Sequence, residues 1–326
     1  MKTFVATAGS SVRPSVARAF PRVCLIAFPA AAILLAQAAT VAIAIDVNLS
    51  TGNLSYNDGQ GHTMPYRLYV PPGYNTPGAK FPLIMFLHGS GESGTDNKKP
   101  STNGHIDNLY NAAHGNYGAQ YDAFLLVPQT LSSVGWEDYG PEYPQYYGQV
   151  LAMDILNQVT STYQVDASRL YVTGLSMGGG GTFDIISHYP HEFAAASPLS
   201  GWGDTSMAPV LKDIPIWAYH GAADTTVSVT YTDEMVAAIQ AAGGSLIEYT
   251  RPAGVGHSGW ETFYNNTTYK NSKGQTFDQW MFAQVLPTPE PGTLVLLGAG
   301  AIIVAAYSWR RRRLGVLTTA FGKEPK

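Results

Sequence analysis

Short apolar runs that end in glycine-rich loops recur along this chain of 326 residues. Phe81–Leu87 and Phe124–Pro128 are continuously apolar, which is typical of strands buried on both faces of a parallel sheet. Tyr66–Val70 alternates between polar and apolar residues and stops at a Pro-Pro-Gly turn. Further runs rich in β-branched and aromatic residues predict strands at 170–173, 193–199, 214–220 and 246–250.

Stretches with helical spacing of apolar residues lie between these strands. This spacing predicts helices over about Pro144–Tyr163 and Thr230–Ala242, and Thr182–His188 is also helix-like. The polar segment Ser93–Gly118 is expected to be irregular with at most one short helix, and Asp46–Thr63 is expected to be a loose leader or an edge hairpin. Strands that alternate with helices over this length predict an α/β fold, namely one domain with a doubly wound, mainly parallel sheet flanked by helices.

The strongest local signal is a Gly-x-Ser-x-Gly motif formed by Gly174, Ser176 and Gly178. A predicted strand leads into it and a helix-like stretch follows, which is the context of a nucleophile elbow. In such a turn the serine sits at the apex, and the flanking residues crowd so closely that only glycine fits. A glycine-rich turn that binds phosphate or merely packs is the alternative, but no Lys-Ser/Thr pair of a P-loop follows.

Two other polar residues lie at the ends of later predicted strands. Asp224 follows the strand at 214–220, and His257 follows the strand at 246–250. Open α/β sheets place their sites at this edge, so we expect Ser176, Asp224 and His257 to meet there. A serine hydroxyl needs an imidazole to take its proton, and a buried carboxylate must fix the tautomer of that imidazole. Asp204, one strand earlier, is the alternative acid.

The order of these motifs resembles the α/β-hydrolases. Val165–Gly179 and the segments 88–91, 220–227 and 256–260 are similar to a secreted esterase group that contains feruloyl and acetylxylan esterases, polyhydroxybutyrate depolymerases and related "predicted peptidases". The resemblance covers Tyr66 to about Gln284. It implies Ser176 as nucleophile, Asp224 as acid and His257 as base. Members that act on polymers often carry binding modules or disulfides, and neither is recognisable in this sequence.

Two backbone N–H groups are expected to bind the oxyanion in an enzyme of this layout. Met177, directly after the serine, supplies the first donor. The second donor comes from the glycine-rich loop His88–Gly94, where Ser90 is our candidate and Gly91 the alternative.

Tryptophans occur in three of the loops that follow or lie near predicted strand ends. We expect Trp136, Trp202 and Trp260 to contact the substrate, and Trp136 in its tyrosine-rich loop predicts an aromatic wall for a sugar ring or an aromatic acid. The alternative for the other rings of this loop is that they pack beneath the following helix.

Charge and cysteine content exclude several classes of function. The formal net charge is −4, and more than half of the Lys and Arg residues lie before residue 46 or after residue 309, so the body between is strongly acidic. An acidic body argues against nucleic-acid binding. The single cysteine, Cys24, lies in a segment that we expect to be removed, and no metal-binding motif occurs. We therefore expect neither a metal nor any other cofactor.

Both ends of the chain carry targeting signals. Residues 1–44 are basic and then apolar, with small residues that fit a signal-peptidase site; an uncleaved anchor is the alternative. At the other end, 287–326, a Pro-Glu-Pro motif precedes an apolar run and four arginines. This arrangement resembles the PEP-CTERM sorting signal of Gram-negative bacteria, which implies one transmembrane span and processing by an exosortase-type enzyme. The domain at 45–286 would then reach the cell surface or the medium after a transient stay in the membrane.

The sequence therefore predicts an exported serine hydrolase that cleaves carboxylic esters, derived from a plant cell-wall polysaccharide or from a polyester. A serine peptidase on the same fold is the first alternative, because both share acyl-enzyme chemistry. A non-catalytic surface or matrix protein that kept the fold is the second.

Overall fold

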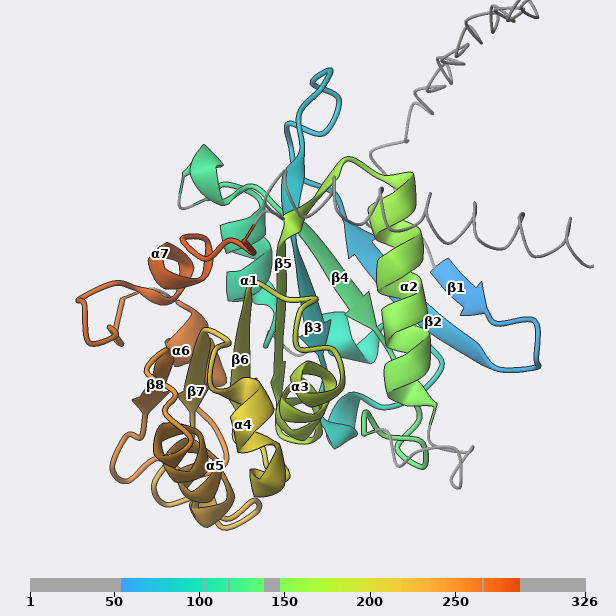
Figure 1. The fold of residues 1–326 in the computed structure, drawn as a ribbon. Helices are drawn as coiled ribbons and strands as arrows, with labels where there is room; N and C mark the ends of the chain where they lie inside the picture. Colours follow the sequence, from blue (N-terminus) through green and yellow to red (C-terminus); the bar gives the residue numbers. More distant parts are fainter. Residues whose placement is uncertain (1–53, 103, 117, 138–146, 266, 288–326) are drawn as a thin grey trace, which may run out of the picture. The chain divides into compact units, whose positions relative to one another are not determined.

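The computed structural model describes residues 54–102, 104–116, 118–137, 147–265 and 267–287. The core of this part is one eight-stranded sheet with the strand order β1-β2-β4-β3-β5-β6-β7-β8 (Figure 1). Its strands are β1 Leu54–Asn57, β2 Thr63–Tyr69, β3 Phe81–Leu87, β4 Phe124–Pro128, β5 Val165–Leu175, β6 Ala195–Leu199, β7 Ile216–Tyr219 and β8 Ile247–Thr250.

The sheet is antiparallel only at its N-terminal edge. β1 pairs with β2, and β2 with β4, in antiparallel register, whereas every other pair of neighbours is parallel. This confirms the doubly wound, mainly parallel sheet, and it shows that part of the segment 46–63 forms the edge hairpin rather than a loose leader. Because the strands from β3 onward are parallel, the loops that follow them lie at one edge of the sheet.

Helices cover both faces of this sheet. One face packs against α2, α3, α4 and α5, and the other against α1, α6 and α7 (Figure 1). These helices are α1 Asp107–Ala113, α2 Gly148–Thr162, α3 Met177–His188, α4 Ala208–Leu211, α5 Val229–Ala241, α6 Trp260–Tyr264 and α7 Phe277–Met281. Short 3-10 turns also occur, among them η2 Ser90–Glu92.

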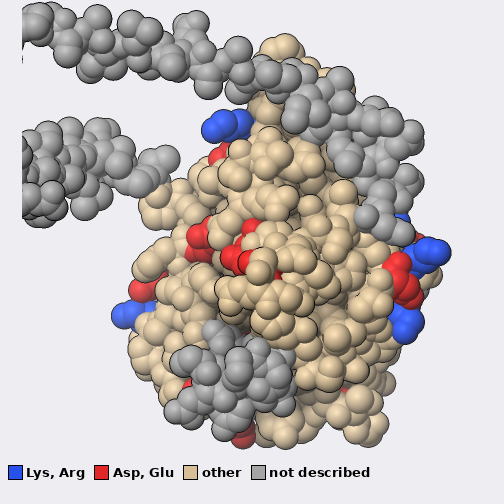
Figure 2. Space-filling model, turned by 90° about the vertical axis from the view of Figure 1, so that its right-hand side faces the viewer, with Lys and Arg blue, Asp and Glu red and all other residues tan. Residues whose placement is uncertain are grey.

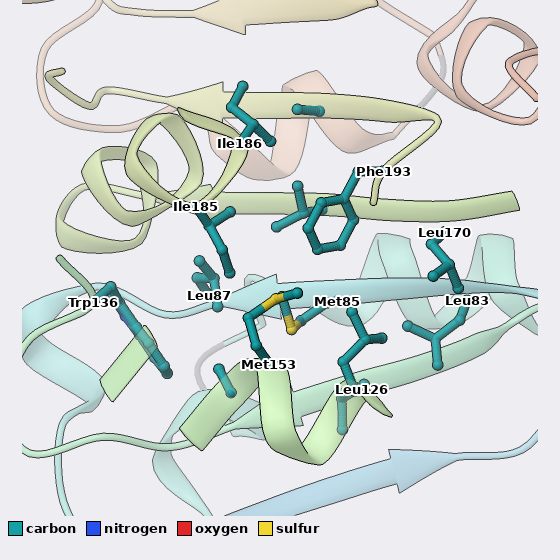
Figure 3. Close-up of a cluster of buried hydrophobic side chains, with 14 of the residues drawn as sticks. Leu83, Met85, Leu87, Leu126, Trp136, Met153, Leu170, Ile185, Ile186 and Phe193 are labelled. Atoms are coloured by element: carbon teal, nitrogen blue, oxygen red, sulfur yellow. The ribbon is translucent and has the colours of Figure 1, made fainter. Parts of the chain in front are cut away.

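Side chains of β3 alternate between the two apolar cores. Leu83, Met85 and Leu87 belong to the core beneath α2 and α3, whereas Ile84 and Phe86 belong to the opposite core. Successive side chains of a strand point to opposite faces, so an unbroken apolar run is what two covered faces require. Figure 3 shows the first core, where side chains of the sheet meet those of the two helices. Each such fully buried side chain contributes about 1.5–3 kcal/mol to folding.

Several predicted element boundaries differ from the observed ones. β3 and β4 coincide with the apolar runs that predict them. The long helix predicted from about Pro144 begins at Gly148, and the segment 138–146 lies outside the described residues. α3 starts at Met177, before the predicted start at Thr182. The sequence pattern missed these first turns because their four glycines carry no apolar side chains.

The predicted signal peptide at 1–44 and the Pro-Glu-Pro motif with its apolar run lie outside the described residues. Within residues 54–287, where described, no helix has the length and apolar character needed to cross a bilayer.

Candidate active site

Ser176 lies at the sharp turn from β5 into α3. Its φ of 55° and ψ of −117° belong to a region that residues other than glycine rarely adopt. A Cβ atom on Gly178 would overlap the carbonyl oxygen of Leu87, and one on Gly174 would overlap the carbonyl oxygen of Gly178. The two motif glycines therefore allow β5, α3 and the end of β3 to approach closely, and the strained turn exposes the serine at the sheet edge.

Ser176, His257 and Asp224 form one hydrogen-bonded chain. The Oγ of Ser176 lies 2.9 Å from Nε2 of His257, and Nδ1 of that ring lies 2.6 Å from Oδ2 of Asp224. The three residues come from the loops that follow β5, β7 and β8. The Nδ1 proton faces the carboxylate, so Nε2 is left to accept the serine proton. The structure thus brings together the three residues that the sequence predicts to act together.

Asp224 is held in its charged form. Its side chain is fully buried, and Oδ1 accepts the N–H groups of Thr226 at 2.8 Å and Val227 at 3.0 Å. Burial raises the pKa of this carboxyl, but the hydrogen bonds from His257 and from the two N–H groups outweigh it and bring the pKa below its ordinary value. The alternative acid, Asp204, is exposed and accepts the N–H of Ser206 at the start of a 3-10 turn.

Trp260 packs against the histidine of this chain. Its ring stands perpendicular to that of His257, with centroids 5.0 Å apart, and its Nε1 donates to Oγ of Ser200 at 3.0 Å. The indole is almost completely buried. The prediction of a substrate contact is therefore corrected to a contact with the imidazole, since a buried ring offers little surface to a ligand.

Trp136 does not form an exposed aromatic wall. It is fully buried in the core beneath α2 and α3, and its Nε1 donates to the backbone oxygen of His88 at 2.9 Å (Figure 3). The prediction that it contacts the substrate is wrong, because the indole has both an apolar environment and a partner for its N–H inside the protein. Trp202 is half-buried at the same edge of the sheet, and its Nε1 donates to Glu137 at 2.6 Å.

The proposed oxyanion donors are the first residues of two helical turns. Met177 begins α3 and Ser90 begins η2, and the first N–H groups of a helical turn have no acceptor within it. Ser90 is exposed, and the residues before it are fixed. The N–H of Gly89 donates to the buried carboxylate of Glu92 at 2.7 Å, and His88 is fully buried beneath the loop.

Sequence reasoning missed three buried polar residues around the site: His88, Glu92 and His220. Glu92 and His88 hold the loop that carries Ser90, while His220 contacts Asp224. Each histidine directly precedes a glycine at a strand end, and this recurring His-Gly pair is the signal that could have indicated the two histidines.

Ionisable side chains elsewhere give little sign of another centre. Among the described residues, no group of three or more His, Cys, Asp or Glu side chains is arranged to hold a metal ion. On the face shown in Figure 2 the charged side chains are scattered, and Lys and Arg form no continuous patch there.

Comparison with known proteins places this geometry in a family. The sequence model described as "Putative esterase" matches residues 59–301. A bifunctional acetylxylan esterase/xylanase of Neocallimastix patriciarum is 26% identical over 53% of this chain and 23% of its own length. A poly(3-hydroxybutyrate) depolymerase of Ralstonia pickettii is 26% identical over 61% of this chain and 46% of its own length. The chain therefore spans less than half of the length of either relative.

The fold also has counterparts among solved structures. The crystal structure of a thermostable esterase superposes with a TM-score of 0.59 at 31% identity, over 73% of this chain and 64% of the other. The strand order, the sharp turn at Ser176 and the family match all indicate the same fold and family. This chain belongs to the esterase family and has the α/β-hydrolase fold.

Proposed function

We propose that this protein is a serine hydrolase that cleaves carboxylic esters through an acyl-enzyme on Ser176. The observation that carries the proposal is the continuous hydrogen-bonded chain from Oγ of Ser176 through His257 to the buried Asp224, at 2.9 and 2.6 Å. In a member of the esterase family, this arrangement has the donor and acceptor order that nucleophilic catalysis requires.

The mechanism follows from the proton positions. As Oγ of Ser176 attacks the ester carbonyl carbon, Nε2 of His257 takes its proton, and the negative charge of Asp224 stabilises the resulting imidazolium. The carbonyl oxygen becomes an oxyanion, for which the N–H groups of Met177 and Ser90 are our candidate donors. The imidazolium then gives its proton to the leaving alcohol. A water, activated by the same imidazole, releases the acid and restores the serine.

The substrate class is proposed from the relatives. The name of one relative refers to acetylated xylan, which is a polysaccharide ester, and the name of the other refers to poly(3-hydroxybutyrate), which is a polyester. We propose that the substrate of this protein is an ester from one of these two sources. Trp202, half-buried at the sheet edge, is the remaining aromatic candidate for a substrate contact.

We also propose that the protein acts outside the cytoplasm. The apolar N-terminal segment at 1–44 and the Pro-Glu-Pro segment at 287–326 support export followed by sorting through a transient membrane anchor and an exosortase-type enzyme. Mass spectrometry of the native mature protein tests this. A C-terminal peptide beyond Arg313 in surface material would contradict processing.

Rates on matched esters and amides test the proposed activity. We expect hydrolysis of nitrophenyl acetate, methyl ferulate or a hydroxybutyrate ester, with far slower cleavage of peptide nitroanilides. Ser176→Ala should lower kcat by a factor on the order of 10⁴–10⁶. Ser187→Ala is the matched control, because this buried serine on α3 only donates to the carbonyl of Phe183. An unchanged rate in the Ser176 variant would contradict the proposal, and faster cleavage of the amides would favour the peptidase.

A further inference from the structure

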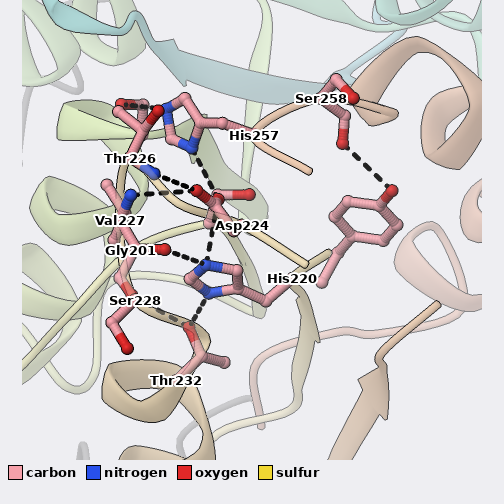
Figure 4. Close-up of polar contacts among 12 residues, drawn as sticks. Gly201, His220, Asp224, Thr226, Val227, Ser228, Thr232, His257 and Ser258 are labelled. Atoms are coloured by element: carbon pink, nitrogen blue, oxygen red, sulfur yellow. Dashed lines mark hydrogen bonds and ion pairs between the residues drawn. The ribbon is translucent and has the colours of Figure 1, made fainter. Parts of the chain in front are cut away.

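Asp224 has a second histidine neighbour. His220, the first residue after β7, is fully buried, and its Nε2 lies 3.2 Å from Oδ2 of Asp224 and 3.0 Å from the carbonyl oxygen of Val227. Its Nδ1 lies 2.8 Å from Oγ1 of Thr232 on α5. Figure 4 shows the ring of His220 between the carboxylate and this hydroxyl, with His257 on the other side of Asp224.

The surroundings of His220 define where its proton lies. Nε2 faces two oxygens that can only accept, so this nitrogen carries a hydrogen; it donates to the carbonyl oxygen of Val227, and Oδ2 of Asp224 lies 3.2 Å from the same nitrogen. Burial lowers the pKa of His220, and the carbonyl of Val227 and the charge of Asp224 offset this only in part. The ring is therefore neutral, and its Nδ1 shares the single hydroxyl hydrogen of Thr232 with the carbonyl oxygen of Gly201, which lies 2.9 Å from the same Oγ1. Hydrogen bonds thus fix both ends of the ring.

The carboxylate of Asp224 is consequently held at both oxygens. Oδ1 accepts two backbone N–H groups, and Oδ2 faces Nδ1 of His257 at 2.6 Å and Nε2 of His220 at 3.2 Å. Among the described residues, His257 and His220 are the side chains whose nitrogen atoms lie near Oδ2, and His257 is the imidazole that the carboxylate must orient. A fully buried carboxylate is costly unless its lone pairs are satisfied, so a fixed donor on the inner side also stabilises its charge.

We propose that His220 is a positioning residue, which donates to Oδ2 of Asp224 and so fixes the carboxylate that orients His257. The inference rests on the proposed ester hydrolysis, since it assigns Asp224 a part in that reaction. The rival view is that His220 merely fills space behind the loop. For variants of His220 the two views predict different values of kcat, a different coupling between His220 and Asp224, and a different effect on the His257–Asp224 hydrogen bond.

Substitutions at His220 separate the effect of its N–H donor from the effect of its ring shape. His220→Phe keeps a planar ring but removes the donor, and a small shift of a catalytic group can lower kcat about 10- to 100-fold, which we expect here with little change in KM. His220→Gln can still donate from its amide, so we expect it to recover most of the lost rate. Ser197→Ala on β6 is the matched control, because it also removes a buried hydrogen bond, from Oγ to the carbonyl of Trp217.

Thr232 provides an independent test if the phenylalanine variant does not fold. Thr232→Val keeps the shape of the side chain and removes the hydroxyl from Nδ1 and from the carbonyl oxygen of Gly201, so we expect kcat to fall severalfold. Thr232→Ser keeps the hydroxyl and should retain the wild-type rate. Equal rates for the valine and serine variants would contradict a role for this hydrogen bond.

A double-mutant cycle and a proton spectrum complete the test. If His220 acts through Asp224, His220→Phe should cost almost nothing further in an Asp224→Asn background, whereas independent structural damage would multiply. The short Nδ1–Oδ2 bond of His257 should give a far-downfield proton resonance, which His220→Phe should move. An unmoved resonance, or rates equal to the Ser197 control, would overturn the inference. The spectrum needs no turnover, so it tests His220 even if the wild type hydrolyses no ester, an outcome that would instead refute the proposed function.

Discussion

Lowering the pH should destabilise this protein, and a large part of the effect should come from the buried His88. Its ring is fully buried, with Nδ1 donating to the carbonyl of Gly89 at 2.7 Å and Nε2 accepting the N–H of Thr130 at 3.0 Å. The ring of Trp136 packs against it in a T-shaped arrangement, with ring centroids 5.0 Å apart. A proton on Nε2 would point at the N–H of Thr130, so the site accommodates only the neutral ring.

The size of the effect follows from the displacement of the pKa. Burial lowers the pKa of His88 from 6.5 to about 4. Between these values the unfolded chain binds a proton that the folded protein does not, so the contribution to stability is present above the unfolded pKa and is lost as the pH falls. Integration gives a loss of about 2 kcal/mol between about pH 7 and about pH 5, and about 3 kcal/mol in full.

Urea unfolding of the wild type and of His88→Gln, at several pH values in this range, measures the effect. The variant carries every other titrating group, so the contribution of those groups cancels in the difference. We expect the variant to be less stable than the wild type at neutral pH, and the gap to shrink by about 2 kcal/mol at about pH 5. Parallel stability curves for the two proteins would refute the neutral, buried state of His88.

Three further predictions concern the elbow, the acid and the tryptophan beside the histidine. Gly178→Ala should destabilise the fold by more than about 3 kcal/mol in thermal unfolding, since its Cβ would overlap backbone, whereas Gly91→Ala has open space and should not; equal melting temperatures would contradict the tight elbow. Asp224→Asn should lower kcat about 10⁴-fold because the imidazole tautomer is lost, while exposed Asp204→Asn should retain the rate; the reverse order would transfer the acid role. Trp260→Phe keeps the ring contact but loses the bond to Ser200, so kcat should fall severalfold and Ser200→Ala should show the same loss; a wild-type rate in both would leave Trp260 without a positioning role.

The sequence predicted the central strands best, because they are buried on both faces. The runs Phe81–Leu87 and Phe124–Pro128 became β3 and β4 residue for residue. Their order in space could not be read in the same way. β4 lies between β2 and β3, and no apolar pattern states which strand a given strand pairs with. α6 and α7 were not expected either, because five residues are too few to show a helical period.

The candidate site divides along similar lines. Ser176, Asp224 and His257 could be predicted to meet because each follows a strand and the parallel sheet gathers such loops at one edge. Trp136 could not be placed, since a tryptophan in a loop between strands looks the same in sequence whether it faces a ligand or the core. His88 and His220 escaped for a related reason. Their importance lies in hydrogen bonds that the sequence does not reveal: His88 contacts Thr130, and His220 contacts Thr232 on the following helix.

Covalent labelling of Ser176 tests the central claim most directly. A fluorophosphonate probe forms a bond from serine Oγ to phosphorus with loss of fluoride, and only a serine activated by a general base reacts at a useful rate. We expect the intact protein to gain the mass of one phosphonyl group, located by peptide mapping on the Leu170–His188 segment, and Ser176→Ala to gain none. Asp224→Asn and His257→Ala should label far more slowly. A labelled Ser176→Ala protein, or a wild type that stays unlabelled, would contradict the assignment of this serine as the nucleophile.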